Sequence, residues 1–250
     1  MIRFAALAVM ALTLISAPAQ ALDLNSMSNA ERALFRAEVR AYLMDNPEVI
    51  IEAVNVLEQR QAVAETAADQ MLVLQNAAEL FDDGFSWVGG NPDGDITLVE
   101  FLDYRCAYCR RAMPEVAKLL AADGNIRLIV KELPILGDDS LVTSRFAVAT
   151  KLVAGADAYK QVHDALMAYN GEISDVALRR LSDGLGLDTD AIMARMAGDD
   201  ISEQLAKTRA LAGQLNISGT PTFVLEDELL RGYLPADQMA ALISEKRDAK

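Results

Sequence analysis

The sequence predicts an α/β fold with an inserted helical subdomain, preceded by an N-terminal helical segment. The run Ile96–Leu102 is mostly apolar, which is typical of a strand buried on both faces. A helical stretch to about Ala122 separates it from residues 126–133, a second candidate strand rich in Ile, Leu and Val. Strand, crossover helix and strand form a βαβ unit, so these two strands are expected to be parallel. Helical periodicity fills residues 22–82 and 139–215.

Residues 1–21 have the features of a secretory signal peptide. Arg3 supplies a positive charge, residues 4–15 are apolar, and Ala19 and Ala21 fit the small-residue cleavage pattern. A transmembrane anchor is the alternative, but the apolar run is shorter than the roughly 20 residues that a spanning helix needs. We therefore expect an exported, periplasmic protein that is cleaved near Ala21.

Residues 22–82 are predicted to form an N-terminal helical segment. Ser28 and Glu31 make a capping box, and Asn46-Pro47 is a second start signal, with Asn46 as the N-cap. Neither Gly nor Pro interrupts residues 48–83, which favours one long helix to about Phe81. Its apolar stripe has to be buried, either against its own domain or against the same segment of another subunit.

Residues 83–250 are predicted to form the main domain, with the helical insertion at about 139–215. Residues 89–94 have the composition of a turn. After the insertion, Thr222–Leu225 and residues 229–233 are typical of a β-hairpin, and a helix over residues 235–246 closes the chain.

The charge and the cysteine count exclude several classes of function. The formal net charge of −14 argues against binding to nucleic acid, which needs clustered Lys and Arg, and against docking on an anionic membrane. Two cysteines and a single histidine, His163, make a metal cage within one chain improbable. We expect no metal site and no cofactor.

Cys106 and Cys109 are the candidate reactive pair. They follow the first predicted strand and open a helix, whose unpaired N–H groups and positive dipole end favour a thiolate on Cys106. Cys109 lies one turn further on the same face, where it can close a disulfide as the resolving thiol. A bond between them closes too small a loop to stabilise a fold, so redox chemistry is the better interpretation. Arg110 and Arg111 are expected on a solvated helix face.

These motifs together resemble the DsbA-like branch of the thioredoxin superfamily. Residues 99–109 (VEFLDYRCAYC) are followed, after a helical insertion, by residues 219–223 (GTPTF), and the likeness covers roughly residues 84–250. The resemblance implies a thioredoxin fold with a helical insertion. It also implies that Thr220-Pro221 is a cis-proline loop beside the disulfide. With Ala107 and Tyr108, this loop is the expected substrate-binding site.

The resemblance also gives Glu100 a role. In such enzymes an acidic residue on the strand beneath the cysteines relays a proton to the buried thiol, and Glu100 stands six residues before Cys106. Burial should raise the pKa of this carboxyl, which suits a proton carrier. The alternative is a Glu at a sheet edge facing water.

Two features depart from strongly oxidising members of the family. The dipeptide between the cysteines is Ala107-Tyr108, whereas those members carry Pro-His, so one source of thiolate stabilisation is missing. Residues 22–82 are similar in placement to the oligomerisation segment of ScsC-like, suppressor-of-copper-sensitivity proteins. The similarity suggests a homo-oligomer suited to isomerising wrong disulfides.

We therefore interpret the chain as a periplasmic thiol–disulfide oxidoreductase, an oxidase or isomerase of protein disulfides. Its expected partners are substrate proteins with thiols or disulfides and a membrane redox partner that resets the cysteine pair. The alternative is a copper-tolerance protein in which the same two thiolates bind Cu(I), a soft ion that thiolates select. A redox-inert holdase is a third interpretation.

Overall fold

A computed structural model describes residues 26–249. The predicted signal peptide, residues 1–21, lies outside the described residues. Packing separates the chain into two compact units, Met1–Gln59 and Arg60–Lys250. Within residues 26–249, no helix combines the length and the apolar character that crossing a membrane requires.

The first unit contains α1 (Asn29–Asp45) and the beginning of α2 (Glu48–Gln75). The predicted capping box is confirmed, since the Glu31 N–H donates to Ser28 Oγ and the Ser28 N–H donates to Glu31 Oε2. Asn46 is not the N-cap that the sequence predicts. Its Nδ2 donates to the carbonyl oxygen of Tyr42 at 2.9 Å, so this side chain satisfies the end of α1.

The predicted single helix up to Phe81 is also interrupted. α2 ends at Gln75, and a short helix, α3 (Ala77–Phe81), follows. Asn76 lies between them with φ −112° and ψ 20°, and its Nδ2 donates to the carbonyl oxygen of Leu72 at 2.8 Å. An Asn side chain that competes for backbone carbonyls in this way favours a helix end.

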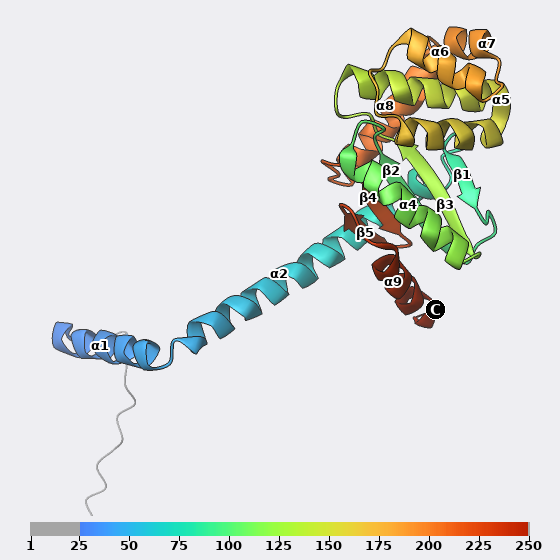
Figure 1. Cartoon of the computed structure of the whole chain (residues 1–250). Helices are drawn as coiled ribbons and strands as arrows, with labels where there is room; N and C mark the ends of the chain where they lie inside the picture. The colour runs from blue at the N-terminus through green and yellow to red at the C-terminus, as the bar shows by residue number, and fades with distance from the viewer. Residues whose placement is uncertain (1–25, 250) are drawn as a thin grey trace, which may run out of the picture. The chain divides into compact units, whose positions relative to one another are not determined.

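The second unit is built on a five-stranded mixed sheet in the order β1-β3-β2-β4-β5 (Figure 1). β2 (Ile96–Leu102) pairs in parallel with β3 (Ile126–Glu132), as predicted. The hairpin of β4 (Thr222–Leu225) and β5 (Glu228–Arg231) is antiparallel and adjoins β2. β2 is therefore a central strand, with neighbours on both sides.

The sequence did not predict the edge strand, because Gly89 and Gly90 suggested a turn. β1 (Trp87–Gly90) pairs antiparallel with β3 at the edge of the sheet. Gly90 has φ +66°, and a Cβ at this position would collide with the carbonyl oxygen of Ile126. Glycine is required here by close strand contact as well as by backbone angle.

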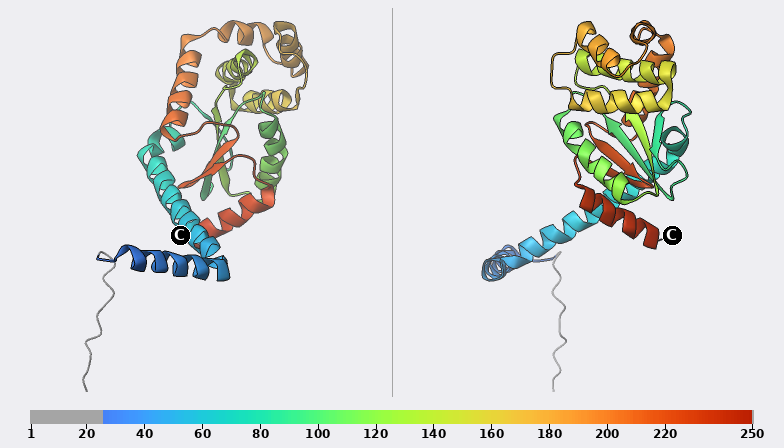
Figure 2. Two further views of the ribbon diagram at one scale, coloured as in Figure 1. Left: turned by 90° about the vertical axis from the view of Figure 1, so that its left-hand side faces the viewer. Right: turned by 45° about the vertical axis from the view of Figure 1, so that its right-hand side comes forward.

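Helices cover both faces of the sheet (Figure 2). α4 (Ala107–Ala122) and α9 (Ala236–Asp248) pack on the face formed by Ile96, Leu98 and Leu102. Val99 and Phe101 point to the other face, which is covered by α3, the end of α2 and α8 (Asp199–Gln214). Residues 60–82, part of the predicted N-terminal segment, thus pack within the second unit.

The predicted insertion is helical. It comprises α5 (Asp138–Ala168), α6 (Asp175–Gly184), α7 (Thr189–Arg195) and α8, which lie together at one end of the sheet (Figure 1). Gly155, with φ +88°, divides α5 into two helical parts. The arrangement is the predicted thioredoxin fold with a helical insertion.

A buried ion pair lies beneath the sheet face opposite α4. Lys131 on β3 has a side chain that is 1% exposed, and its Nζ lies 2.5 Å from Asp83 Oδ2 and 2.6 Å from the carbonyl oxygen of Glu79. Removing one partner of such a pair leaves an uncompensated buried charge.

We predict that Asp83→Asn lowers the free energy of unfolding by about 3–5 kcal/mol. Guanidinium unfolding followed by circular dichroism measures this change. Asp190→Asn is the matched control, since Asp190 pairs with Arg179 on the surface and its loss should leave the free energy of unfolding almost unchanged. Equal losses in the two variants would contradict the prediction.

Candidate functional site

The turn between β2 and α4 places the cysteines. Cys106 is the N-cap of α4, and its backbone N–H donates to the carbonyl oxygen of Asp103 at 3.0 Å. The buried Asp103 carboxylate accepts from the N–H of Arg105, at 2.8 Å, and from the N–H groups of Ile135 and Leu136 after β3. The carboxylate thus ties the cysteine turn to the neighbouring loop.

Cys106 has the environment of a nucleophile. Its pKa is lowered from 9.0 to about 5, first by a hydrogen bond from the Cys109 thiol. The backbone N–H groups of Cys109 and Tyr108 add to this effect, and burial opposes it. The N–H groups are those of the first turn of α4, so the helix-start argument made from sequence agrees with the geometry.

Cys109 has the opposite environment. Its side chain is fully buried, and its pKa lies far above the usual value because it donates to Cys106 and because burial disfavours a thiolate. Both cysteines are free thiols. Ala107 and Tyr108 between them are exposed, Tyr108 to 60%. At neutral pH the Cys106 sulfur therefore has the character of a nucleophile, whereas Cys109 stays a protonated thiol.

The loop before β4 lies beside Cys106, as expected. The Thr220–Pro221 peptide bond is cis. In its thiol form, Cys106 donates through Sγ to the carbonyl oxygen of Thr220 at 3.1 Å. The Pro221 carbonyl oxygen accepts from the Gly232 N–H at 3.0 Å, which ties this loop to the end of β5. Segments 114 residues apart thus meet at one sulfur.

Glu100 lies in the central strand and is only 3% exposed, so a water-facing Glu at a sheet edge is wrong. It shares a sheet face with Leu98 and Leu102, the face that α4 and Cys109 cover. Burial, together with the charge of Glu132, raises its pKa from 4.5 to about 8. The Glu100 charge in turn contributes to the raised pKa of Cys109, which indicates that the two groups interact.

Glu132 was not identified from the sequence as a residue of the candidate site. It ends β3 on the same sheet face as Glu100 and is 6% exposed. Two charged residues, Lys131 and Glu132, at the end of an apolar run were the available signal. The ends of parallel strands lie at one sheet edge, so Glu132 could have been placed near Leu102 and the cysteine turn.

Arg110 differs from the solvated position expected. It is half-buried, and its Nε donates to the carbonyl oxygen of Tyr104 at 2.9 Å while Nη1 donates to Asn170 Oδ1 at 2.7 Å. It therefore connects the cysteine turn to the end of the α5 segment. Arg111 is exposed, with its guanidinium 4.4 Å from the centre of the Tyr233 ring.

His163 does not join the cysteines in a metal site. It is buried beside Tyr104, whose hydroxyl lies 3.2 Å from His163 Nδ1. Over the part of the chain that the structure describes, no three His, Cys, Asp or Glu side chains are grouped so as to hold a metal ion.

We predict that alkylation of Cys106 by iodoacetamide rises with pH through a midpoint of about 5, because only the thiolate reacts and the folded pKa is about 5. Mass spectrometry after timed quenching measures the rate. Cys109→Ala removes the strongest of the stabilising hydrogen bonds and should move the midpoint toward 9.0. A wild-type midpoint near 9.0 would contradict the geometry.

Comparisons with known proteins agree with this arrangement. The DSBA-like thioredoxin domain family matches residues 97–244, and the family described as the copper resistance protein ScsC N-terminal domain matches residues 31–64. Among curated proteins, a Na(+)/H(+) antiporter NhaA 3 of Salinispora tropica is 29% identical over 156 residues, which is 62% of this chain. The chain spans about a quarter of that antiporter's length (24%).

Two solved structures extend the comparison. A thioredoxin-like oxidoreductase from Silicibacter pomeroyi DSS-3 is 39% identical with a TM-score of 0.65, covering 69% of this chain and 98% of that one. Proteus mirabilis ScsC in a transitional conformation is 25% identical with a TM-score of 0.66, covering 90% of this chain and all of that one. The chain belongs to the DSBA-like thioredoxin domain family, and its residues 31–64 match the ScsC N-terminal domain.

Proposed function

We propose that the chain exchanges disulfides with substrate proteins through Cys106 and Cys109. The observation that carries this proposal is the contrast between the two sulfurs. Cys106 is a thiolate at neutral pH, and Cys109 is a buried thiol that donates to it. Disulfide exchange needs a nucleophile, a resolving thiol and a place for the resolving thiol's proton.

In the oxidising direction, a substrate thiolate attacks Sγ of Cys106 in the Cys106–Cys109 disulfide. The bond between the cysteines breaks, and Cys109 leaves and takes up a proton from Glu100. A second substrate thiolate then attacks the substrate sulfur of the mixed disulfide, so that the substrate is oxidised and both cysteines are reduced. A carboxyl with a pKa of about 8 can give or take a proton near neutral pH.

In the isomerising direction, the Cys106 thiolate attacks a wrong substrate disulfide. The released substrate thiolate attacks another disulfide of the same protein, or Cys109 displaces the substrate from Cys106. The Ala107-Tyr108 dipeptide leaves Cys106 without a neighbouring His, which favours a less oxidising couple than Pro-His enzymes have. We place the protein in the periplasm, where a membrane redox partner resets the pair.

Substrate binding is assigned to the surface around Cys106. The Thr220–Pro221 loop lies next to the reactive sulfur and can pair its backbone with an extended substrate segment. Ala107 and the exposed Tyr108 ring border the same sulfur and can pack against the substrate side chains that flank its cysteine.

We predict that Cys106→Ser abolishes reduction and reoxidation of a model substrate such as scrambled ribonuclease, whereas Cys109→Ser accumulates mixed disulfides. Non-reducing gels and recovery of ribonuclease activity measure both outcomes. Full exchange activity in the Cys106→Ser variant would contradict the proposal.

Copper tolerance is the second candidate, because the family that matches residues 31–64 is described as a copper resistance protein domain. In this case the two thiolates would bind Cu(I). A Cu(I) titration of the reduced protein distinguishes the candidates. One bound ion per cysteine pair without turnover of the ribonuclease substrate would favour copper handling.

The N-terminal unit supports self-association. Its large apolar side chains are exposed: Leu34 is 72% exposed, Tyr42 55% and Ile51 61%, and α1 buries no residue. An apolar helix face of this extent is stable in water when another surface covers it. We propose that the same helices of a second copy cover it, so that several active sites belong to one oligomer.

We predict that the double variant Leu34→Glu, Val39→Glu shifts the protein toward the monomer, because it places charges in the interface. Sedimentation velocity measures the mass. Glu38→Gln on the same helix serves as the control and should leave the mass unchanged. A wild-type protein that sediments as a monomer at high concentration would contradict the proposal.

A further inference from the structure

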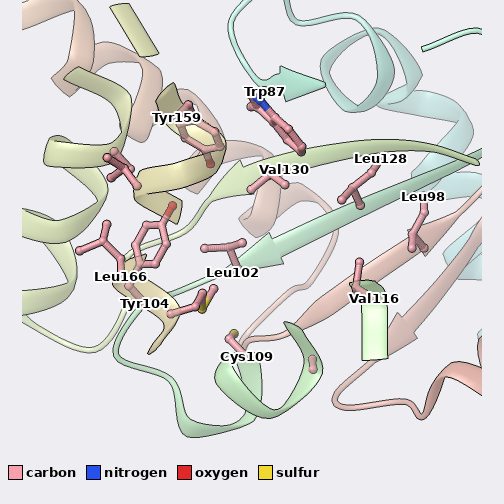
Figure 3. Close-up of a cluster of buried hydrophobic side chains, with 14 of the residues drawn as sticks. Trp87, Leu98, Leu102, Tyr104, Cys109, Val116, Leu128, Val130, Tyr159 and Leu166 are labelled. Atoms are coloured by element: carbon pink, nitrogen blue, oxygen red, sulfur yellow. The ribbon is translucent and has the colours of Figure 1, made fainter. Parts of the chain in front are cut away.

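Glu132 accepts hydrogen bonds from three hydroxyl groups inside the second unit. Tyr104 donates to Oε1 at 2.8 Å and Tyr159 donates to Oε1 at 2.6 Å, while Ser144 donates to Oε2 at 2.8 Å. All four residues are buried. Figure 3 shows Tyr104 and Tyr159 with their hydroxyl groups turned toward each other.

The geometry is that of an ionised carboxylate. A carboxylate can only accept, and both oxygens are occupied by donors. Since the Tyr104 hydroxyl donates its hydrogen bond to Glu132, its oxygen can only accept from His163, which assigns the hydrogen to Nδ1. Burial lowers the pKa of His163 to about 4, so this ring is neutral at pH 7. Hydrogen bonds thus run from His163 through Tyr104 to Glu132.

Packed aromatic rings hold this set in place. The Trp87 ring stacks on Tyr159 with centres 5.6 Å apart, and Tyr159 stacks on His163 at 6.0 Å. Trp87 Nε1 also donates to the carbonyl oxygen of Ala156 at 3.0 Å. Rigid packing matters, because an ionised buried carboxylate is tolerated only when its donors stay in position.

Glu132 and Glu100 lie on neighbouring strands and on the same sheet face. In the parallel register Glu132 is opposite Leu102, two residues along β2 from Glu100. The two charges repel, and this repulsion adds to burial in raising the pKa of Glu100. The hydroxyl groups lower the pKa of Glu132 against burial, which leaves it at about 7. The three hydroxyl donors make Glu132 the more readily ionised of the two carboxyls.

A small cavity reaches Glu132 from the side of β1. It has a volume of about 20 Å³ and is lined by Glu132, Tyr159, Lys151 and Gln204, among others. One water molecule needs about 10–15 Å³ and two or more polar partners, and this cavity meets both conditions. It therefore has room for one water molecule beside Glu132.

We propose that Glu132 is a positioning residue for disulfide exchange: its charge, held by Tyr104, Tyr159 and Ser144, sets how readily Glu100 takes the proton of Cys109. The proposal rests on the function proposed above. Titratable and charged groups face the two carboxyls from each packed element: Cys109 from α4, Asp103 and Tyr104 from the turn after β2, and Lys151, Tyr159 and His163 from α5.

The influence of Glu132 on Glu100 can be measured in the resolving step, in which Cys109 attacks the mixed disulfide at Cys106. Reduced Cys106 attacks the aromatic disulfide dithiobisnitrobenzoate, forms a mixed disulfide and releases one thionitrobenzoate. Cys109 then gives its proton to the Glu100 carboxylate, and its sulfur attacks Cys106. The Cys106–Cys109 bond forms, the mixed disulfide breaks and the second thionitrobenzoate leaves. The protein loses two electrons, which the reagent gains.

Stopped-flow absorbance with one equivalent of reagent resolves the two releases. In the wild type, the rate of the second release should rise with pH through a midpoint of about 8, as Glu100 ionises. In Glu132→Gln the repulsion is gone, so the midpoint should move down by about one unit. The plateau at high pH should fall several-fold, because Glu100 is then a weaker base. The first release should keep its rate.

Tyr159→Phe is the second variant, because it keeps the stacked ring and removes one donor to Glu132. Glu132 then ionises less readily, and the midpoint should move in the same direction by a smaller amount. Glu203→Gln, on the surface of α8, is the acid-to-amide control and should match the wild type. Thermal unfolding confirms that each variant is folded.

An unchanged midpoint and plateau in folded Glu132→Gln or Tyr159→Phe would overturn this inference and leave the proposed function intact. Absence of any second release in the wild type, or a normal first release in Cys106→Ser, would instead overturn the proposed function itself.

Discussion

The Asp103 carboxylate accepts backbone N–H groups from two loops that are 30 residues apart, at Arg105 and at Ile135 and Leu136. The turn between β2 and α4 and the loop after β3 are held together by these bonds. The position of Cys106 at the start of α4 depends on this turn, since its own N–H is bound to the Asp103 carbonyl oxygen. A single buried acid thus aligns the parallel strand ends, the reactive sulfur and the entrance to the helical insertion.

The same strand ends explain why acids lie inside the core. β2 and β3 are covered on both faces, so side chains at their carboxyl ends are buried whether they are apolar or not. On one face this brings Glu100 close to Cys109 and Glu132 against Tyr104, and on the other it buries Lys131 against Asp83. The buried charged groups are stabilised differently on the two faces of the sheet. Lys131 has an opposite charge, whereas the acids have raised pKa values that permit proton transfer.

The proposed active site combines segments that are far apart in the sequence of the second unit. β2 and α4 contribute the cysteines, and the loop before β4 contributes the Thr220 carbonyl oxygen. Arg110 connects the cysteine turn to Asn170 after α5. The helical insertion is thereby attached to the turn that carries Cys106. Tyr159 and Ser144, which belong to the insertion, donate hydrogen bonds to Glu132 at the end of β3.

By itself, the sequence determined the βαβ unit, the start of a helix at Cys106, and the proline loop. These follow from local periodicity, from helix-end chemistry and from residues that keep their character wherever they are placed. Only the tertiary structure decided that Gly89 and Gly90 form a strand, that Asn76 divides a helix, and that Arg110 is anchored. It alone brought Glu132, Tyr104 and Tyr159 together with Glu100. Such contacts join residues up to about sixty positions apart, and their energies depend on burial and register, which no local pattern contains.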